Sequence, residues 1–121
     1  MCNILLLDDE LFIQDLFSQF FREKGYNVVC VSNGRKGLEK LRDFDADLII
    51  TDIMMPDMDG LEVVREIRKN YADLPVIAIS GGMRNAAINF VSAAKDFGAD
   101  VIFEKPVELS ELLASVKELI G

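Results

Sequence analysis

Residues 47–60, DLIITDIMMPDMDG, decide how the rest of the chain is read. The segment opens with a continuous apolar run and then places one carboxylate, Asp52, where that run stops. Strands that carry apolar residues at consecutive positions are covered on both faces, as in a parallel sheet. Pro56 and Gly60 then favour a turn away from the sheet. The segment therefore predicts a buried parallel strand that carries Asp52 to the edge of the sheet.

Four further apolar runs have the same character, and a segment of helical period follows each of the five. The four runs span residues 3–7, 27–31, 75–80 and 100–104, and the strand in the quoted segment spans residues 47–51. Strands that alternate with helices predict an α/β fold, here (βα)5, with a parallel sheet and right-handed crossovers. We expect the apolar positions of each helix to face the core. These include Phe12, Ile13, Leu16, Phe17, Phe20 and Phe21 in the first helix and Ala87, Val91, Ala94 and Phe97 in the fourth.

Length and charge limit the classes of function that the chain supports. Its 121 residues fit one domain, residues 1–121, and are enough for a core without disulfide staples. The 21 acidic and 13 basic residues give a net charge of −8. No basic patch is available for the phosphates of a nucleic acid or of an anionic membrane, so we expect neither as a partner.

The chain contains no histidine and only two cysteines. The lack of histidine excludes histidine metal sites, Ser-His or Cys-His catalysis and a phosphohistidine on this chain. Cys2 and Cys30 are too few for a disulfide scaffold, and the strand assignment puts them at opposite ends of neighbouring strands, unpaired. No basic stretch precedes the N-terminal apolar run, and no apolar stretch reaches about 18 residues, so we expect a cytoplasmic protein.

Acidic, hydroxyl and basic side chains follow four of the five predicted strands. Ligands of open α/β sheets bind at the carboxyl ends of the strands, so we expect these groups to meet in one pocket. Crowded carboxylates repel one another unless a hard divalent cation, with Mg²⁺ the natural candidate, or an internal lysine balances their charge. Each acid alone also fits a helix cap or a turn, but their convergence with a hydroxyl and an ammonium favours a site. The groups are Asp8, Asp9 and Glu10 after the first strand, Asp52 after the third, Ser80 with Gly81 and Gly82 after the fourth, and Lys105 with Pro106 after the fifth.

The quoted segment fits two other aspartate sites less well. Although Asp57 and Asp59 match a calcium-binding loop, its first ligand would be Met55, which is not a ligand for a hard cation. A haloacid-dehalogenase-type phosphatase would need a second acid two residues after Asp52, where Met54 stands. Neither site is therefore expected.

Five short motifs, LLLDDE, TDIMMPDMDG, AISGG, FGAD and EKP, occur in this order along the chain. Together they resemble the receiver domain of two-component response regulators, in particular the stand-alone, chemotaxis-Y-like members, over essentially all 121 residues. The resemblance implies a flavodoxin-like (βα)5 fold with strand order 2-1-3-4-5 and helices on both faces of the sheet. It also implies a phosphorylation-activated switch in a phosphorelay, fed by a sensor histidine kinase or phosphotransfer protein and read by a downstream protein. We expect a monomer or a weak dimer.

The same resemblance assigns the centre of the pocket, residue by residue. Asp52 would be the phosphoacceptor and would form an acyl phosphate. Asp9 and Asp52, with the backbone carbonyl of Met54, would hold Mg²⁺, and Asp8 would assist directly or through water. Such a domain is not an enzyme in the usual sense, because it catalyses only its own Mg²⁺-dependent phosphorylation and dephosphorylation.

The resemblance also implies how the phosphoryl group is bound and sensed. Ser80 would donate to one phosphoryl oxygen, and Lys105, joined to Pro106 by a cis bond, would pair with another. Ser80 would move toward the phosphoryl group, followed by the residue three before the lysine, which is aromatic in the family and is Ile102 here. Strand alternation aims the neighbouring Phe103 at the other face of the sheet.

Two other functions remain open on the same scaffold. A protein-interaction module that is never phosphorylated would fit the fold, but such degenerate receivers usually lose acids or the lysine, and this chain keeps them. A metal-dependent hydrolase of small phosphoesters is less well supported, because the chain offers no general base besides carboxylates.

Overall fold

The computed structural model of the chain describes residues 2–55, 60–81 and 98–120. The strands are β1 (Asn3–Leu7), β2 (Asn27–Val31), β3 (Leu48–Asp52), β4 (Val76–Ser80) and β5 (Val101–Glu104), and the helices are α1 (Leu11–Glu23), α2 (Gly34–Lys40), α3 (Gly60–Asn70) and α5 (Leu109–Ile120). The predicted fourth helix, with Ala87, Val91, Ala94 and Phe97, lies outside the described residues. No helix in the described ranges is both long and apolar enough to cross a membrane.

The five strands form one parallel sheet in the order β2-β1-β3-β4-β5, which confirms the predicted fold class. Every residue of β3 and of β4 is buried, whereas the edge strands β2 and β5 are mostly half-buried. The predicted strand bounds hold to within one residue. The difference at β3 matters most for the site. The sequence predicts that this strand ends at Thr51, but it runs to Asp52, which is therefore the last residue of a buried strand.

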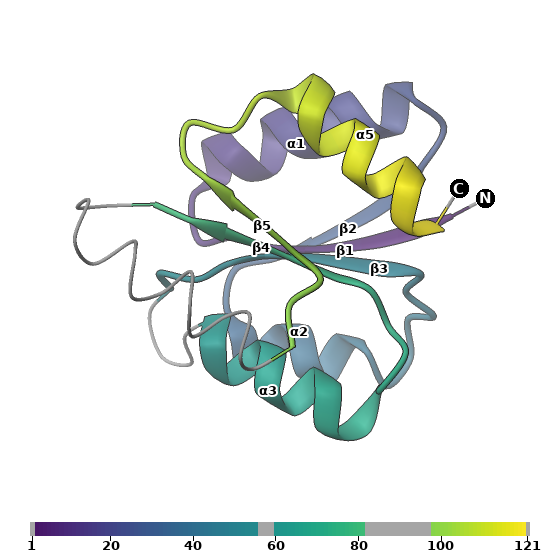
Figure 1. Cartoon of the computed structure of the whole chain (residues 1–121), viewed down its shortest axis with the longest axis vertical. Helices are drawn as coiled ribbons and strands as arrows, with labels where there is room; N and C mark the ends of the chain where they lie inside the picture. The colour runs from purple at the N-terminus through teal and green to yellow at the C-terminus, as the bar shows by residue number, and fades with distance from the viewer. Residues whose placement is uncertain (1, 56–59, 82–97, 121) are drawn as a thin grey trace.

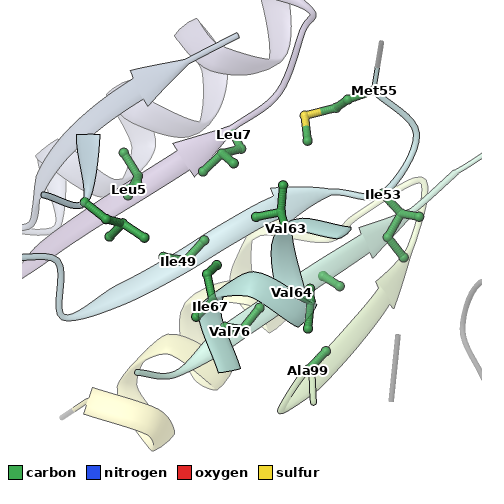
Figure 2. Packing of buried hydrophobic residues seen from close by; sticks show 12 residues of the cluster. Leu5, Leu7, Ile49, Ile53, Met55, Val63, Val64, Ile67, Val76 and Ala99 are labelled. Carbon is green, nitrogen blue, oxygen red and sulfur yellow. The ribbon is translucent and has the colours of Figure 1, made fainter. Parts of the chain in front are cut away.

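Helices cover both faces of the sheet, with α1 and α5 on one side and α2 and α3 on the other (Figure 1). Side chains alternate along the strands between the two resulting cores. Leu5 and Ile49 belong to the α2–α3 core, and Leu6 and Ile50 belong to the α1–α5 core. Figure 2 shows the first of these cores, where α3 lays its apolar side chains against the sheet. Each fully buried aliphatic side chain of this kind contributes about 1.5–3 kcal/mol of transfer free energy.

Short polar signals fix the ends of the helices. Asn33 precedes α2, and its side-chain oxygen accepts a hydrogen bond from the backbone N–H of Lys36 at 2.9 Å. Asparagine is one of the residues preferred at this cap position. Gly25, with φ of +94°, follows α1 in the left-handed conformation that ends many helices.

The prediction that all the apolar residues of the first helix face the core is wrong for Phe12 and Leu16, whereas Ile13 packs, partly buried, against the α1–α5 core. Phe17 and Phe21 are buried, but Phe12 is 73% exposed, Leu16 is 41% exposed and Leu11 is 72% exposed. Adjacent residues of a helix point about 100° apart, so two neighbours such as Leu16 and Phe17 cannot both face the sheet. The result is an exposed apolar surface on α1.

Hydrogen bonds also tie the strands together at their amino ends. Arg68 at the end of α3 donates to the carbonyl oxygens of Gly98 at 2.7 Å and Leu74 at 2.5 Å, and it pairs with Asp100 at 2.5 Å. The Asp100 carboxylate also accepts from the backbone N–H of Val76, the first residue of β4, at 2.8 Å. At the amino ends of β1 and β3, Asp47 Oδ2 accepts a hydrogen bond from the backbone N–H of Asn3 at 2.7 Å.

Candidate functional site

Strand register brings four groups of polar residues to the carboxyl edge of the sheet. Leu7 pairs with Thr51, so the next residues, Asp8 and Asp52, lie side by side at the ends of β1 and β3. At the end of β4, Ser80 pairs with the last residue of β5, and its carbonyl oxygen accepts from the backbone N–H of Lys105 at 2.8 Å. The predicted meeting of the four strand ends is therefore present.

Two of the three aspartates at this edge are buried. Asp8 is 1% exposed and Asp52 is 3% exposed, whereas Asp9 is exposed. One carboxylate oxygen from each of the three residues lies within 4.8 Å of the others. A set of hard oxygen donors at this spacing suits Mg²⁺, which binds carboxylates and keeps waters in its remaining positions. The residues present therefore fit a divalent cation.

The buried carboxylates have raised pKa values. Burial raises the pKa of Asp8 from 3.8 to about 6, against the lowering effect of a hydrogen bond from the Glu10 N–H, and the nearby charge of Asp52 raises it further. Burial likewise raises the pKa of Asp52, although the Lys105 ammonium opposes this. A bound cation would relieve both the desolvation and the mutual repulsion.

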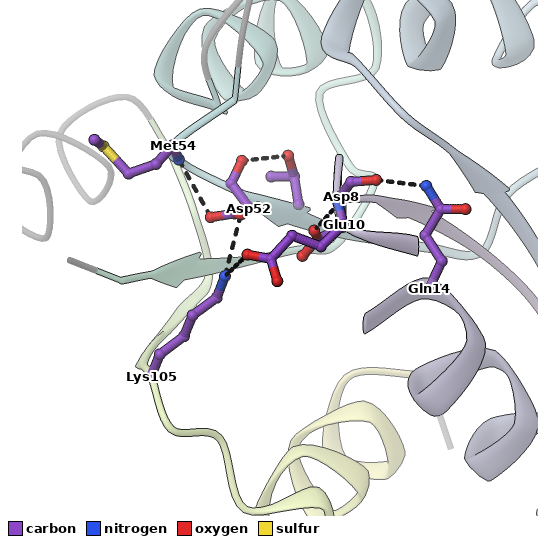
Figure 3. A network of polar contacts seen from close by, with 7 residues as sticks. Asp8, Glu10, Gln14, Asp52, Met54 and Lys105 are labelled. Carbon is purple, nitrogen blue, oxygen red and sulfur yellow. Dashed lines mark hydrogen bonds and ion pairs between the residues drawn. The ribbon is translucent and has the colours of Figure 1, made fainter. Parts of the chain in front are cut away.

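Lys105 reaches over the pocket as its internal counter-ion (Figure 3). Its Nζ lies 3.3 Å from Asp52 Oδ2 and 3.9 Å from Glu10 Oε1. Burial lowers the pKa of Lys105, but the charges of Asp52 and Asp8 outweigh burial and leave the pKa raised. The peptide bond from Lys105 to Pro106 is cis, as expected from the motif.

Gly81 makes room for this lysine. A Cβ atom at Gly81 would come 2.7 Å from Cδ of Lys105. The aliphatic part of Lys105 therefore passes directly over the glycine on its way to Asp52. Gly82, which follows in the same motif, lies outside the described residues.

The side chain of Asp52 is oriented by the loop that follows it. Its Oδ1 accepts a hydrogen bond from the backbone N–H of Met54 at 3.2 Å, while its Oδ2 faces Lys105. The Met54 side chain is 49% exposed beside the pocket, whereas Met55 is buried in the α2–α3 core. A metal-binding role for the Met54 carbonyl stays a prediction.

Ser80 is fully buried, and its hydroxyl oxygen has no hydrogen-bond partner among the described residues. A buried hydroxyl without a partner costs about 1–3 kcal/mol, so a ligand that supplies an acceptor is favoured there. On β5, Ile102 packs with the α2–α3 core and Phe103 with the α1–α5 core. The expected alternation is confirmed, and the switching role of Ile102 stays a prediction.

Two residues near the pocket, Gln14 and Glu10, make contacts that the sequence does not predict. Gln14, in the first turns of α1, donates from Nε2 to the carbonyl oxygen of Asp8 at 2.6 Å and so ties the helix to the acid pair. The sequence predicts that Glu10 follows the first strand, but it does not predict the contact of Glu10 with Lys105. Glu10 and Gln14 are four residues apart, about one helical turn, and this spacing is the sequence signal that links these two residues.

An apolar hollow of about 480 Å³ adjoins the pocket. Lys105 forms part of its wall, which joins it to the acidic site. Its lining consists of Ile13, Leu16, Phe17, Lys105, Pro106 and Val107, from α1 and the segment between β5 and α5. The exposed apolar surface of α1 continues from it.

Comparison with known proteins gives the same assignment from sequence and from structure. The family model for the response regulator receiver domain matches residues 4–117. A CheY-like response regulator receiver domain protein from Methanospirillum hungatei JF-1 is 28% identical, with a TM-score of 0.90 over 99% of this chain and 94% of that chain. The signal receiver domain of a signal transduction histidine kinase from Syntrophus aciditrophicus is 29% identical, with a TM-score of 0.90 over 99% and 90%.

A third similar structure is the chemotaxis response regulator CheY4 of Vibrio cholerae, 27% identical, with a TM-score of 0.87 over 98% of each chain. Receiver domains are signalling phosphoacceptors of phosphorelays, and they bind Mg²⁺ through acidic residues such as those clustered at this sheet edge. The family match covers the five strands, except for the first residue of β1, and the acidic cluster at their ends, and the chain therefore belongs to the response regulator receiver domain family.

Proposed function

We propose that Asp52 accepts a phosphoryl group from a phosphohistidine on a sensor histidine kinase or a phosphotransfer protein. Residues 1–121 then act as one receiver domain, which passes on the signal through altered protein binding. One observation carries the proposal. A carboxylate that is 3% exposed lies 3.3 Å from an ammonium, beside an aspartate pair and a buried hydroxyl that has no partner in the described part of the chain.

The proposed step is an in-line attack by a carboxylate oxygen of Asp52 on phosphorus. The new P–O bond forms as the P–N bond to the donor imidazole breaks, and the nitrogen keeps the electron pair and takes up a proton. Asp52 ends a fully buried strand, and the Met54 N–H holds one of its oxygens, so little orientational freedom is left to lose. Such positioning is a large part of catalysis in phosphoryl transfer.

The remaining polar groups would bind the transferred group. Lys105 would exchange its contact with Asp52 for one with a phosphoryl oxygen, and the Ser80 hydroxyl, for which residues 2–55, 60–81 and 98–120 supply no acceptor, would gain one. Asp8, Asp9 and Asp52, with the Met54 carbonyl, would hold Mg²⁺, which supplies positive charge against the charge that builds on the phosphoryl group.

Phosphorylation would change the domain through Ser80 and Ile102. It adds roughly −1.5 to −2 units of charge beside Lys105, and it shifts an existing equilibrium by its different interaction with two conformers. Ser80 and Ile102 lie on the neighbouring strands β4 and β5, and Ile102 packs in the α2–α3 core. A shift of Ser80 toward the phosphoryl group would leave space for Ile102 to follow and would reshape the surface around β5.

The apolar surface of α1 supports a protein donor. Phe12 and Leu16 are exposed next to the hollow that Lys105 shares with the acidic site. Exposed apolar surfaces of this kind mark interaction sites. A partner that covers this surface would bring its phosphohistidine to the mouth of the pocket, and it would shield the transfer from water.

Incubation with a small-molecule phosphodonor and Mg²⁺, followed by intact-protein mass spectrometry, tests the proposal. We expect a mass gain of one phosphoryl group in the wild type and in the control D73N, which removes an exposed acid, and no gain in D52N. Absence of any gain would favour the unphosphorylated interaction module. Turnover of small phosphoesters without covalent incorporation would favour the hydrolase.

A further inference from the structure

We propose that Glu10 limits how readily the pocket accepts anionic phosphodonors. Its carboxylate is a fixed negative charge beside Lys105 and opposes the entry of a phosphoryl group. The inference rests on the proposed function and deepens it, because it assigns a rate-setting residue outside the set expected to bind the phosphoryl group or the metal.

The backbone of Glu10 is held in place on both sides. Its N–H donates to Asp8 Oδ1 at 2.9 Å, and its carbonyl oxygen accepts from the N–H of Gln14 at 3.0 Å. The side chain is 61% exposed and points to the ammonium of Lys105, which contacts Glu10 and Asp52 at once (Figure 3). The backbone anchor therefore keeps the carboxylate within reach of the pocket mouth.

Glu10 contributes little to the placement of Lys105. The ammonium is already within hydrogen-bonding distance of Asp52, at 3.3 Å, and its aliphatic chain passes over Gly81. The contact with Glu10, at 3.9 Å and largely in water, is too long for a hydrogen bond and belongs to the class of weak surface pairs. Removal of the Glu10 charge would change the local potential more than the geometry.

The size of the effect follows from the separation of the charges. A phosphoryl oxygen bound about 2.8 Å from Lys105 Nζ would lie no more than about 6.7 Å from Glu10 Oε1, given the 3.9 Å contact. Two unit charges at that distance in water repel by an energy close to RT, so two phosphoryl charges slow entry about eightfold without salt. Screening reduces this to about fivefold at roughly 10 mM ionic strength, about 2.5-fold at roughly 150 mM and almost nothing at about 1 M.

A charge series at position 10 tests the inference. The measurement is the initial rate of phosphorylation by acetyl phosphate, followed by mass spectrometry, at Mg²⁺ concentrations that saturate each variant. At low ionic strength we expect E10D to stay near the wild type, E10Q to react about fivefold faster, and E10K to react faster still. All four proteins should converge in high salt. Phosphoramidate, which carries less negative charge, should show a smaller increase.

The matched controls are E118Q and E118K, because Glu118 is an exposed acid near the end of α5, by the opposite edge of the sheet. They make the same change in net charge, and their rates should stay near the wild type. If Asp52 of the wild type is phosphorylated but E10Q is no faster than E10D, or its gain persists in high salt, the inference fails while the proposed function stands. If E10Q is slower, Glu10 positions Lys105 and the inference is wrong. If the wild type takes up no phosphoryl group, both fail.

Discussion

Replacement of Asp8 by asparagine removes a carboxylate whose ionised form is less stable in the folded chain than in water. The pKa of Asp8 is raised from 3.8 to about 6 when the chain folds. Between these values the folded state binds more protons than the unfolded state, so the free energy of unfolding falls as pH rises through this window and levels off above it. At 1.36 kcal/mol per pKa unit, the loss for the ionised group is about 3 kcal/mol at neutral pH.

The D8N side chain keeps an oxygen that accepts from the Glu10 N–H but carries no charge, so the variant escapes this loss. Without metal, we expect D8N to be more stable than the wild type by about 1 kcal/mol near pH 4.5 and by about 3 kcal/mol near pH 7.5. Urea unfolding with a chelator at both pH values measures the difference, with D73N as the control for removal of an exposed acid. A D8N variant that gains nothing at the higher pH, or gains equally at both, would refute the account of Asp8 as a strained buried charge.

Four further predictions concern metal binding, packing and docking. Mg²⁺ should raise the melting temperature of the wild type but raise it much less in D8N, as thermal unfolding with and without a chelator will show. Gly60→Ala should cost about 2–4 kcal/mol in urea unfolding, because its Cβ would come 2.5 Å from Cα of Ile53 in the backbone next to Asp52; a cost below that of a surface change would contradict the close approach. Arg68→Ala should cost about 3–5 kcal/mol, whereas the exposed Arg65→Ala on the same helix should cost almost nothing; equal losses would refute the anchoring role. Phe12→Ser should leave stability unchanged but slow transfer from a phosphohistidine protein and not from acetyl phosphate, which separates docking from chemistry.

The sheet could be predicted from the sequence because both of its faces are covered. Burial on two sides demands consecutive apolar residues, and this demand marks β3 and β4 clearly. The convergence of Asp8, Asp52 and Lys105 then followed from the rule that strand ends meet at one edge. Their individual roles came from the family resemblance, because spacing alone does not distinguish a nucleophile from a metal ligand.

Other features depended on contacts that no local pattern encodes. Periodicity showed that α1 is rich in apolar residues, but it did not tell which of them, such as Phe12, stay exposed. Arg68 reaches Gly98, 30 residues away, and nothing near either residue indicates the pairing. The contact of Glu10 with Lys105 likewise depends on the path of a flexible side chain over Gly81.

The polar groups at the two ends of this sheet differ in how well they are paired. At the amino ends of the strands, Arg68, Asp100 and Asp47 find partners in neighbouring backbone groups. At the carboxyl ends, a buried hydroxyl has no partner among the described residues, and the acids ionise reluctantly. Substitutions that reinforce the amino side, for example around Asn3, should therefore raise stability without altering the polar groups at the carboxyl edge.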